Sequence, residues 1–133
     1  MAAKTQHKSL PSARKEAELV ALSTAKVMIK GSVPKLNRAL SVIRGTRLGE
    51  AMNYLYFCGF ACGQPLAKLL KSAAANAFDR GLIKDLDQLY IVQIWAVKGM
   101  ELRRMRAASR GRGSPRRKSY SQVFVSLGMP SGI

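Results

Sequence analysis

A long basic segment in the interior of the chain constrains the fold more than any other feature. It occupies residues 98–120 and reads KGMELRRMRAASRGRGSPRRKSY. Residues 89–97 before it are rich in β-branched and aromatic side chains, and residues 121–127 after it alternate, so both flanks are predicted strands. The sequence RGRGSP at its centre suits a chain reversal. The simplest geometry is a long β-hairpin over residues 97–120.

The charge of this hairpin predicts its partner. Residues 98–118 hold nine cations, seven of them arginines, and a single acid, Glu101. At about 3.3 Å per residue, an arm from residue 97 to residue 110 would reach roughly 40 Å. An isolated two-stranded ribbon is marginal even without like-charge repulsion, so a partner that neutralises both arms is expected. Folded RNA fits, because guanidinium groups bind phosphates and stack on bases. The alternative is a merely solvated loop.

Length and net charge narrow the function classes. The chain has 133 residues, which fits one domain with one modest core. It carries 23 Lys and Arg against 7 Asp and Glu, a formal charge of +16. A surface with this charge favours a polyanion: nucleic acid, an anionic membrane or an acidic protein. The apolar stretches are too short to span a membrane, and the basic segment lacks the periodicity of a membrane-surface helix. No membrane partner is expected.

Catalytic groups are scarce. The single histidine, His7, lies in a polar N-terminal stretch, and Asp79, Asp85 and Asp87 surround a predicted helix end and loop. These acids are interpreted as capping or solvated groups. No nucleophile, base and orienting group can be assembled from the chain. The sequence therefore predicts no enzyme activity, no cofactor and no small-molecule substrate.

The two cysteines and the N-terminus bear on metal binding and compartment. Cys58 and Cys62 have no second ligand pair, so no metal site is expected. Their spacing would place both on one helical face, as buried small hydrophobic residues in a reducing compartment. The N-terminus lacks a secretory apolar segment, and Glu16 and Glu18 argue against an organellar transit peptide.

Hydrophobic periodicity predicts the remaining elements: a strand over residues 24–30 and three helices, one between Ser32 and Gly45, one over 48–57 and one over 61–80. Ser32 is a candidate N-cap. Pro65 marks either a kink in the third helix or a true start near Gly63. Residues 1–22 form a polar extension in which a short helix over 13–21 is left open.

A second set of cations lies on the predicted helical part of the chain: Lys30, Lys35, Arg38, Arg44, Arg47, Lys68 and Lys71. Each one alone is an ordinary exposed charge. As a group, they predict that the globular part also contacts phosphate groups of the nucleic acid.

Several motifs carry a resemblance to a known family: residues 32–35 (SVPK), 42–45 (VIRG), 50–52 (EAM), 69–77 (LLKSAAANA) and 102–113 (LRRMRAASRGRG). Together they resemble large-subunit ribosomal protein twenty-two of the bacterial or organellar type, over about residues 25–127. The pair formed by the SAAANA helix and the basic hairpin is specific, whereas either motif alone would be weak.

The resemblance implies an α+β fold, with three helices packed on a small antiparallel sheet and a long protruding basic β-hairpin. Residues 23–127 would form a single domain between the extension over 1–22 and a short tail over 128–133. The protein would be a structural part of the large ribosomal subunit, in contact with its RNA and neighbouring proteins. The hairpin would thread inward so that its tip lines the wall of the peptide exit tunnel.

Carried onto this chain, the resemblance implies two sets of site residues. The expected RNA-binding cations are Lys30, Lys35, Arg38, Arg44, Arg47, Lys71, Arg103, Arg104, Arg106, Arg110, Arg112, Arg116, Arg117 and Lys118. The expected tunnel tip comprises Ala108, Ser109, Arg110, Gly111, Arg112, Gly113 and Ser114.

The chain departs from the family pattern in places. Pro34 is displaced by one position, residues 107–109 (AAS) replace a usual Pro-Arg-Ala, and Arg116 and Arg117 stand where apolar residues are frequent. The extension has no counterpart in the family. The expected location is the cytoplasmic bacterial ribosome, with a mitochondrial or plastid ribosome as the alternative. The main alternative function is a DNA-binding architectural protein, because Arg-rich ribbons also enter DNA grooves.

Overall fold

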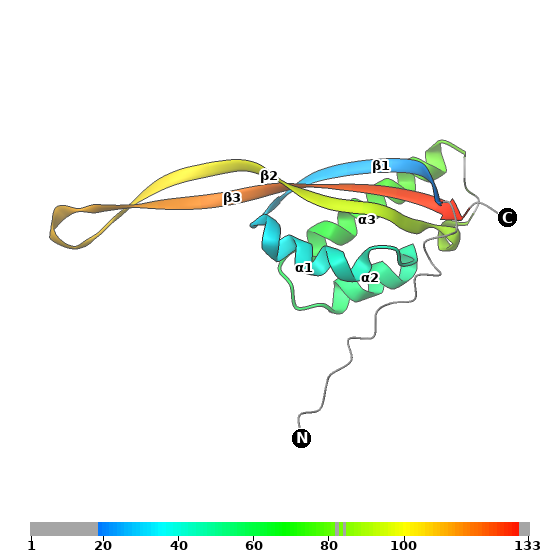
Figure 1. Cartoon of the computed structure of the whole chain (residues 1–133), viewed down its shortest axis with the longest axis horizontal. Coiled ribbons are helices and arrows are strands. Elements are labelled where there is room, and N and C mark those ends of the chain that lie inside the picture. Colours follow the sequence, from blue (N-terminus) through cyan, green and yellow to red (C-terminus); the bar gives the residue numbers. More distant parts are fainter. Residues whose placement is uncertain (1–18, 82, 84, 131–133) are drawn as a thin grey trace, which may run out of the picture.

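The computed structural model describes residues 19–81, 83 and 85–130. They form an α+β fold with three α-helices and one antiparallel sheet, which confirms the predicted class (Figure 1). The elements in chain order are β1 (Leu19–Lys30), α1 (Val33–Ile43), α2 (Leu48–Phe57), α3 (Gly63–Asp79), the short 3-10 helix η2 (Leu86–Gln88), β2 (Tyr90–Ala107), the turn η3 (Ser109–Gly111) and β3 (Gly113–Pro130).

The sheet has the strand order β1-β3-β2, so the last strand of the chain lies in the middle. Val27 of β1 and Ala96 of β2 both pair with Val123 of β3. The strands β2 and β3 have 18 residues each, whereas β1 has 12. Because β1 covers only one part of β3, the rest of β2 and β3 continues as a two-stranded ribbon beyond the helices (Figure 1).

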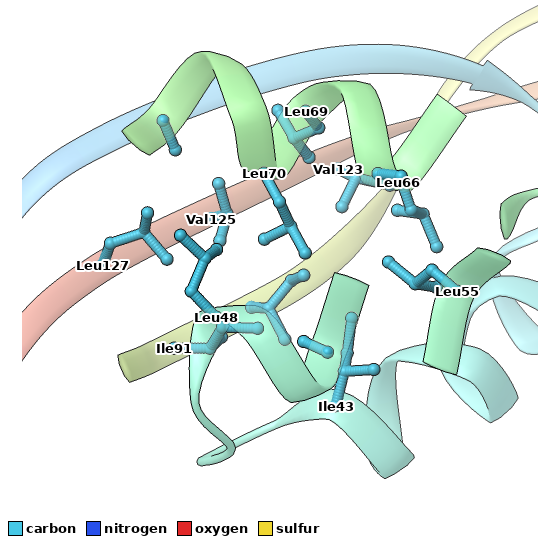
Figure 2. Close-up of a cluster of buried hydrophobic side chains, with 14 of the residues drawn as sticks. Ile43, Leu48, Leu55, Leu66, Leu69, Leu70, Ile91, Val123, Val125 and Leu127 are labelled. Atoms are coloured by element: carbon cyan, nitrogen blue, oxygen red, sulfur yellow. The ribbon is translucent and has the colours of Figure 1, made fainter. Parts of the chain in front are cut away.

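The core lies between the helices and one face of the sheet. Side chains alternate along a strand, so every second residue of β3 points to the core: Val123, Val125 and Leu127 are buried. Leu66 and Leu70 of α3 pack with them in the same core cluster. Figure 2 shows these side chains converging from the sheet and the helices. All three helices bury an apolar stripe here, as their periodicity predicts.

The SAAANA motif joins α3 to the edge strand β1. Ala73 and Ala77 are fully buried, and small side chains let the helix approach the sheet closely. The Ser23 hydroxyl donates a hydrogen bond of 2.8 Å to the Ala73 carbonyl. The Asn76 side-chain amide donates one of 3.2 Å to the Thr24 carbonyl. The motif therefore has a structural role, because it fastens the shortest strand of the sheet.

The starts of α3 and α1 agree with the sequence analysis and decide the alternative that it left open at Pro65. The third helix begins at Gly63, so Pro65 lies in its first turn, where the missing N–H removes no intrahelical hydrogen bond. The kink alternative is therefore wrong. Ser32 is the N-cap of α1 as predicted, but its side chain makes no capping hydrogen bond. The fixed φ of Pro34 in the first turn contributes to starting this helix.

The strand predicted from residue 24 begins at Leu19 instead. Leu19 and Val20 pair with Pro130 and Met129 of β3, a long-range ladder that local periodicity does not reveal. The open possibility of a helix over 13–21 is wrong for residues 19–21, and residues 13–18 lie outside the described residues. At the other end, β3 runs to Pro130, three residues past the predicted strand end.

The cysteines do not share a helical face. Cys58 is the C-cap of α2 and Cys62 the N-cap of α3, because α2 ends before Cys58 and the chain turns at Ala61 and Cys62 before α3 begins. Both thiols are free and half-buried. The Cys58 thiol donates a hydrogen bond of 3.3 Å to the Leu55 carbonyl. Burial raises the pKa of the Cys62 thiol.

Candidate nucleic-acid interface

The basic segment forms the predicted hairpin. Its ladder runs outward from Glu101 opposite Ser119 to Ala107 opposite Gly113. Every residue from 103 to 118 is exposed to solvent. This ladder has seven pairs, so six residue steps join the first to the last, and at about 3.3 Å per residue it is roughly 20 Å long. The hairpin extends beyond the helices (Figure 1), and both of its faces are exposed over residues 103–118.

The arginines of the two arms face one another. Arg103 pairs with Arg117, and Arg104 pairs with Arg116. Successive residues of a strand point to opposite faces, so each face of the ribbon carries one such pair. Like charges directly opposite each other destabilise a ladder. A phosphate bound between two arginines would remove that repulsion, which makes the ribbon suited to a polyanion on either face.

The base of the hairpin has a bulge and its single acid. The register shifts between Lys98 and Glu101, where β2 has one extra residue. The carboxylate of Glu101 lies 3.5 Å from the Lys98 Nζ and 3.7 Å from the Arg117 Nε. A Cβ on Gly99 would lie 3.0 Å from the Tyr120 carbonyl oxygen, so only glycine fits this approach without a shift. The bulge sets the direction in which the ribbon leaves the sheet.

The tip is a compact turn. The Ala108 amide donates to the Arg112 carbonyl at 2.8 Å, and the Arg112 amide donates to the Ser109 carbonyl at 3.3 Å. Arg110 (φ 57°) and Gly111 (φ 72°) are both in the left-handed region. Glycine adopts this conformation freely, but for arginine it costs about 1–2 kcal/mol. Arg110 therefore lies at the end of the ribbon in a backbone conformation that is unfavourable for arginine.

Some cations of the globular part lie near the base of the hairpin. Lys30 ends β1 opposite Tyr120, and the Gly31 amide donates to the Ser119 carbonyl at 3.0 Å. The helix α1 starts directly after this contact and carries Lys35 and Arg38, both exposed. Lys30, Lys35 and Arg38 therefore extend the positive surface of the ribbon to the start of α1.

Arg44 and Arg47 lie at the opposite end of α1 and have partners within the protein. The Arg44 guanidinium donates to the Ile94 carbonyl at 3.0 Å. The Arg47 Nε donates to the Tyr90 hydroxyl at 2.8 Å, and its guanidinium lies 5.7 Å from the centre of that ring. The hydrogen bond to Tyr90 raises the pKa of Arg47. Both side chains are exposed, so each is pre-positioned by β2 and still presents its charge to solvent.

Lys71 belongs to a different surface. Its Nζ lies 5.7 Å above the Tyr56 ring, and Lys71 borders an apolar groove of about 560 Å³ between α2 and α3. Asp79 and Asp87 also line this groove. The structure therefore separates Lys71 from the hairpin cations that the sequence grouped with it. Lys68 is likewise exposed on α3.

One exposed feature was missed by the sequence reasoning. The Trp95 and Phe124 rings are stacked on the sheet face away from the helices, with centroids 5.6 Å apart and planes 13° from parallel. Lys26 is the β1 residue paired with Phe124. The alternation of the strands could have revealed it, because Phe124 lies between the buried Val123 and Val125, and Trp95 follows the buried Ile94.

Neither a metal centre nor a membrane span is formed by the part of the chain that the structure describes. Within residues 19–81, 83 and 85–130, no three His, Cys, Asp or Glu residues gather to hold a metal ion. No helix in these ranges is long and apolar enough to cross a membrane. The chemistry that these residues offer is the binding of anions by guanidinium and ammonium groups.

Comparison with known proteins identifies the family. A model of the family described as ribosomal protein L22p/L17e matches residues 24–128. The large ribosomal subunit protein uL22 of Neorickettsia sennetsu is 39% identical over 104 residues, which is 78% of this chain and 91% of that protein. The protein of the same name from Ehrlichia chaffeensis is 39% identical over 99 residues, 74% of this chain and 86% of its own. This chain therefore belongs to the L22p/L17e family of ribosomal proteins, which are structural and non-enzymatic components.

Proposed function

We propose that this protein, a structural constituent of the large ribosomal subunit, holds ribosomal RNA with its hairpin and with the exposed cations of α1. The observation that carries the proposal is the pairing of arginine with arginine across the ribbon at Arg103–Arg117 and Arg104–Arg116. Such an arrangement is unfavourable in water and favourable between RNA phosphates. Selection for a stable free hairpin would not produce it.

The globular cations extend this RNA-binding surface. Lys30, Lys35 and Arg38 adjoin the hairpin base, and Arg44 and Arg47 lie one helix length away, about 16 Å for an eleven-residue helix. Phosphates of one strand are spaced closely enough that both groups can engage the same RNA segment. Arg47 is the most pre-organised of them, because Tyr90 holds its guanidinium from one side. Arg106, Arg110, Arg112 and Lys118 complete the set on the ribbon.

The hairpin tip is proposed to line the peptide exit tunnel. This part of the proposal rests on the family to which the chain belongs and on the compactness of the turn over residues 108–114. A ribbon that projects beyond the domain can pass between RNA helices and bring a small turn to a wall that the globular part does not reach (Figure 1).

Neighbouring ribosomal proteins are proposed to dock on the groove between α2 and α3. Its lining is mostly apolar, and Phe78 at its edge is 58% exposed. Two acids, Asp79 and Asp87, line this groove beside exposed apolar side chains. Carboxylates repel RNA and attract the basic segments that ribosomal proteins carry. A photo-cross-linker at position 78 in assembled subunits would identify the neighbour.

The proposed location is the bacterial ribosome in the cytoplasm. The relatives described above are bacterial proteins of the large subunit, which supports this location. A mitochondrial or plastid ribosome remains the competing proposal. Sedimentation of the native protein with ribosomes of the cytoplasmic or the organellar fraction distinguishes the two.

The decisive experiment is assembly in the presence and absence of the hairpin charges. Large subunits depleted of this protein are supplied with the wild-type chain or with Arg103→Ala/Arg104→Ala, and sedimentation measures the bound fraction. The wild-type chain is expected to sediment with the subunit, and the double variant to require several-fold more protein. Met100→Ala/Met105→Ala on the same arm is the matched control, because it removes exposed side chains without charge. Binding only to duplex DNA, with none to the subunit, would establish the architectural DNA-binding alternative instead.

A further inference from the structure

The sheet face away from the helices is open and carries an aromatic pair. Lys26, Phe124 and Trp95 form one row across β1, β3 and β2, since directly paired residues point to the same face. Trp95 is 42% exposed, and Phe124 is half-buried. A hollow of about 500 Å³ lies over this row and is lined by Thr24, Lys26, Trp95 and Phe124 among others. Its size is that of a site for a small ligand or a nucleotide.

The charge of this face selects an anionic ligand. Lys26 and Lys30 are exposed on β1. The acids of the described residues lie on the helices, around η2 and at the hairpin base: Glu50, Asp79, Asp85, Asp87 and Glu101. None of them belongs to the strand segments that form the open face. A ligand that stacks a flat apolar surface on a free face of this ring pair and brings a negative charge to a lysine matches an RNA nucleotide.

The dimensions of the row agree with one nucleotide. Neighbouring strands are about 4.8 Å apart, so the backbones of Lys26 and Trp95 are separated by roughly 10 Å. A base stacked on the aromatic pair would have its phosphate within reach of the long Lys26 side chain. Bases inside a duplex are already stacked on each other, so a ring on the protein can receive only an unpaired base.

We propose that the Trp95–Phe124 pair is a stacking platform for an unpaired base of ribosomal RNA, with Lys26 contacting the adjacent phosphate. This inference rests on the RNA-binding function proposed above and adds base stacking to it as a second mode of binding. The hairpin binds RNA by charge, whereas the open sheet face distinguishes single-stranded from duplex RNA. Base–aromatic stacking typically changes affinity by roughly 5- to 150-fold when the ring is removed.

The test uses the fact that Trp95 is the only tryptophan of the chain. The full-length protein is titrated with a twelve-nucleotide single-stranded RNA and, separately, with its duplex form. Tryptophan emission reports stacking, and the anisotropy of a labelled RNA reports total binding. Emission is expected to be quenched by the single strand and to change little with the duplex, although both bind through the hairpin.

Variants separate the platform from the rest of the surface. Trp95→Leu and Phe124→Leu should each weaken single-strand binding roughly 5- to 150-fold and leave duplex binding unchanged. Met28→Gln, on the same face and 46% exposed, should change neither affinity. Far-UV circular dichroism of each variant verifies that the fold is retained, and Trp95→Phe, which keeps a ring, should recover most of the affinity.

The outcomes are distinguishable. RNA binding by anisotropy without quenching, or equal losses of single-strand and duplex binding in Trp95→Leu, would overturn the platform while the RNA-binding function stands. An absence of binding to either RNA would remove the proposed function itself. A blue shift of Trp95 emission that depends on protein concentration, in the absence of RNA and abolished by Met28→Gln, would identify the face as a protein–protein interface and would also overturn the platform.

Discussion

Arg103 on β2 lies directly opposite Arg117 on β3, and both side chains are on the same face of the hairpin. The relationship is repeated one residue further out by Arg104 and Arg116, on the other face. Among the residues that the structure describes, the acid of the hairpin, Glu101, contacts only the first of these pairs, through Arg117. The ribbon therefore lacks an internal counterion along most of its length, and its behaviour should depend on the anions around it.

The affinity for RNA should fall steeply as salt concentration rises. Each phosphate contact releases condensed counterions and contributes about 0.7–0.9 to the slope of log affinity against log salt. Arg104→Ala and Arg112→Ala should each flatten this slope by up to that amount. Met105→Ala, 73% exposed on the same arm, should leave the slope unchanged. Filter binding between low and high salt measures it, and an affinity independent of salt would contradict the phosphate mechanism.

The hairpin should gain order on binding RNA. In the free protein, like charges line both arms and little apolar surface is buried, so amides over residues 99–119 should exchange rapidly. On RNA the same amides should be protected. Hydrogen exchange by mass spectrometry, with and without RNA, measures the difference.

A single charge reversal tests whether repulsion between opposed arginines, or the low stability of any two-stranded ribbon, causes the rapid exchange. Arg116→Glu places an acid opposite Arg104, which should stabilise the free hairpin by about 0.5 kcal/mol and slow its exchange. The same variant should bind RNA less tightly. Strong protection of the wild-type ribbon without RNA, or no change of exchange in Arg116→Glu, would mean that cross-strand repulsion does not control its order.

The extent to which the sequence predicts this structure depends on how local each signal is. The hairpin over residues 97–120 was predictable, because its charges, flanking strands and central turn all lie within one segment. The hydrogen bond of Arg47 to Tyr90 and that of Arg44 to Ile94 join residues 43 and 50 positions apart. Local sequence patterns cannot predict hydrogen bonds between residues so far apart in the chain. The start of β1 at Leu19 likewise depends on a partner at Pro130.

The aromatic pair illustrates a signal that was present but incomplete. Alternation shows that Trp95 and Phe124 point away from the core, yet only the register of β2 against β3 brings them together. That register includes shifts between Ile91 and Gln93 and between Lys98 and Glu101. A bulge inserts an extra residue into one strand and interrupts the regular alternation, and sequence alternation alone does not show where this happens. Sequence periodicity alone can therefore place each residue on a face of its strand, but it cannot place the two beside each other.

Gly63 should be required for the packing of α3 against α2. A Cβ at this position would lie 2.5 Å from the Leu55 carbonyl oxygen, which is backbone and cannot rotate away. Gly63→Ala should lower the free energy of unfolding by about 1–3 kcal/mol. Gly49→Ala in α2 is the matched control, because nothing lies within 4 Å of its Cβ position and alanine favours a helix. Thermal unfolding of both variants measures the effect, and equal midpoints would show that the helix start adjusts without cost.

The Cys62 thiol should contribute a pH dependence to stability. Burial raises its pKa in the folded state, so the unfolded chain loses the thiol proton at lower pH than the folded one. The contribution of Cys62 to the free energy of unfolding is therefore present below about pH 8.5, the ordinary pKa of a thiol. It is lost as the pH rises through the pKa that the thiol has in the folded protein. In the Cys58→Ser background, urea unfolding should show a decline above pH 8.5 that Cys62→Ser removes. Alkylation of Cys62 faster than that of a free thiol at pH 8 would contradict the direction of the shift.

The hairpin tip should be dispensable for assembly and required for events in the peptide exit tunnel. Deleting residues 108–114 removes the turn but retains the pair of Met105 with Pro115, so the ribbon can close again with Arg106 and Ala107 as a two-residue loop. The deletion removes Arg110 and Arg112 and spares the opposed arginines nearer the domain. Subunit yield should therefore be close to that of the wild type, while macrolide binding and stalling at an arrest peptide are altered.

The control for this deletion is Arg110→Ala/Arg112→Ala, which removes the same two charges and keeps the turn. If the shape of the tip forms part of the tunnel wall, the deletion should affect stalling much more strongly than the double substitution. If charge at the wall matters instead, the two variants should have similar effects. Purified subunits carrying each variant are compared in yield, in macrolide binding and in arrest. A collapse of subunit yield, with binding and arrest unchanged in the subunits that do form, would make the tip an assembly element and would remove the tunnel-wall assignment.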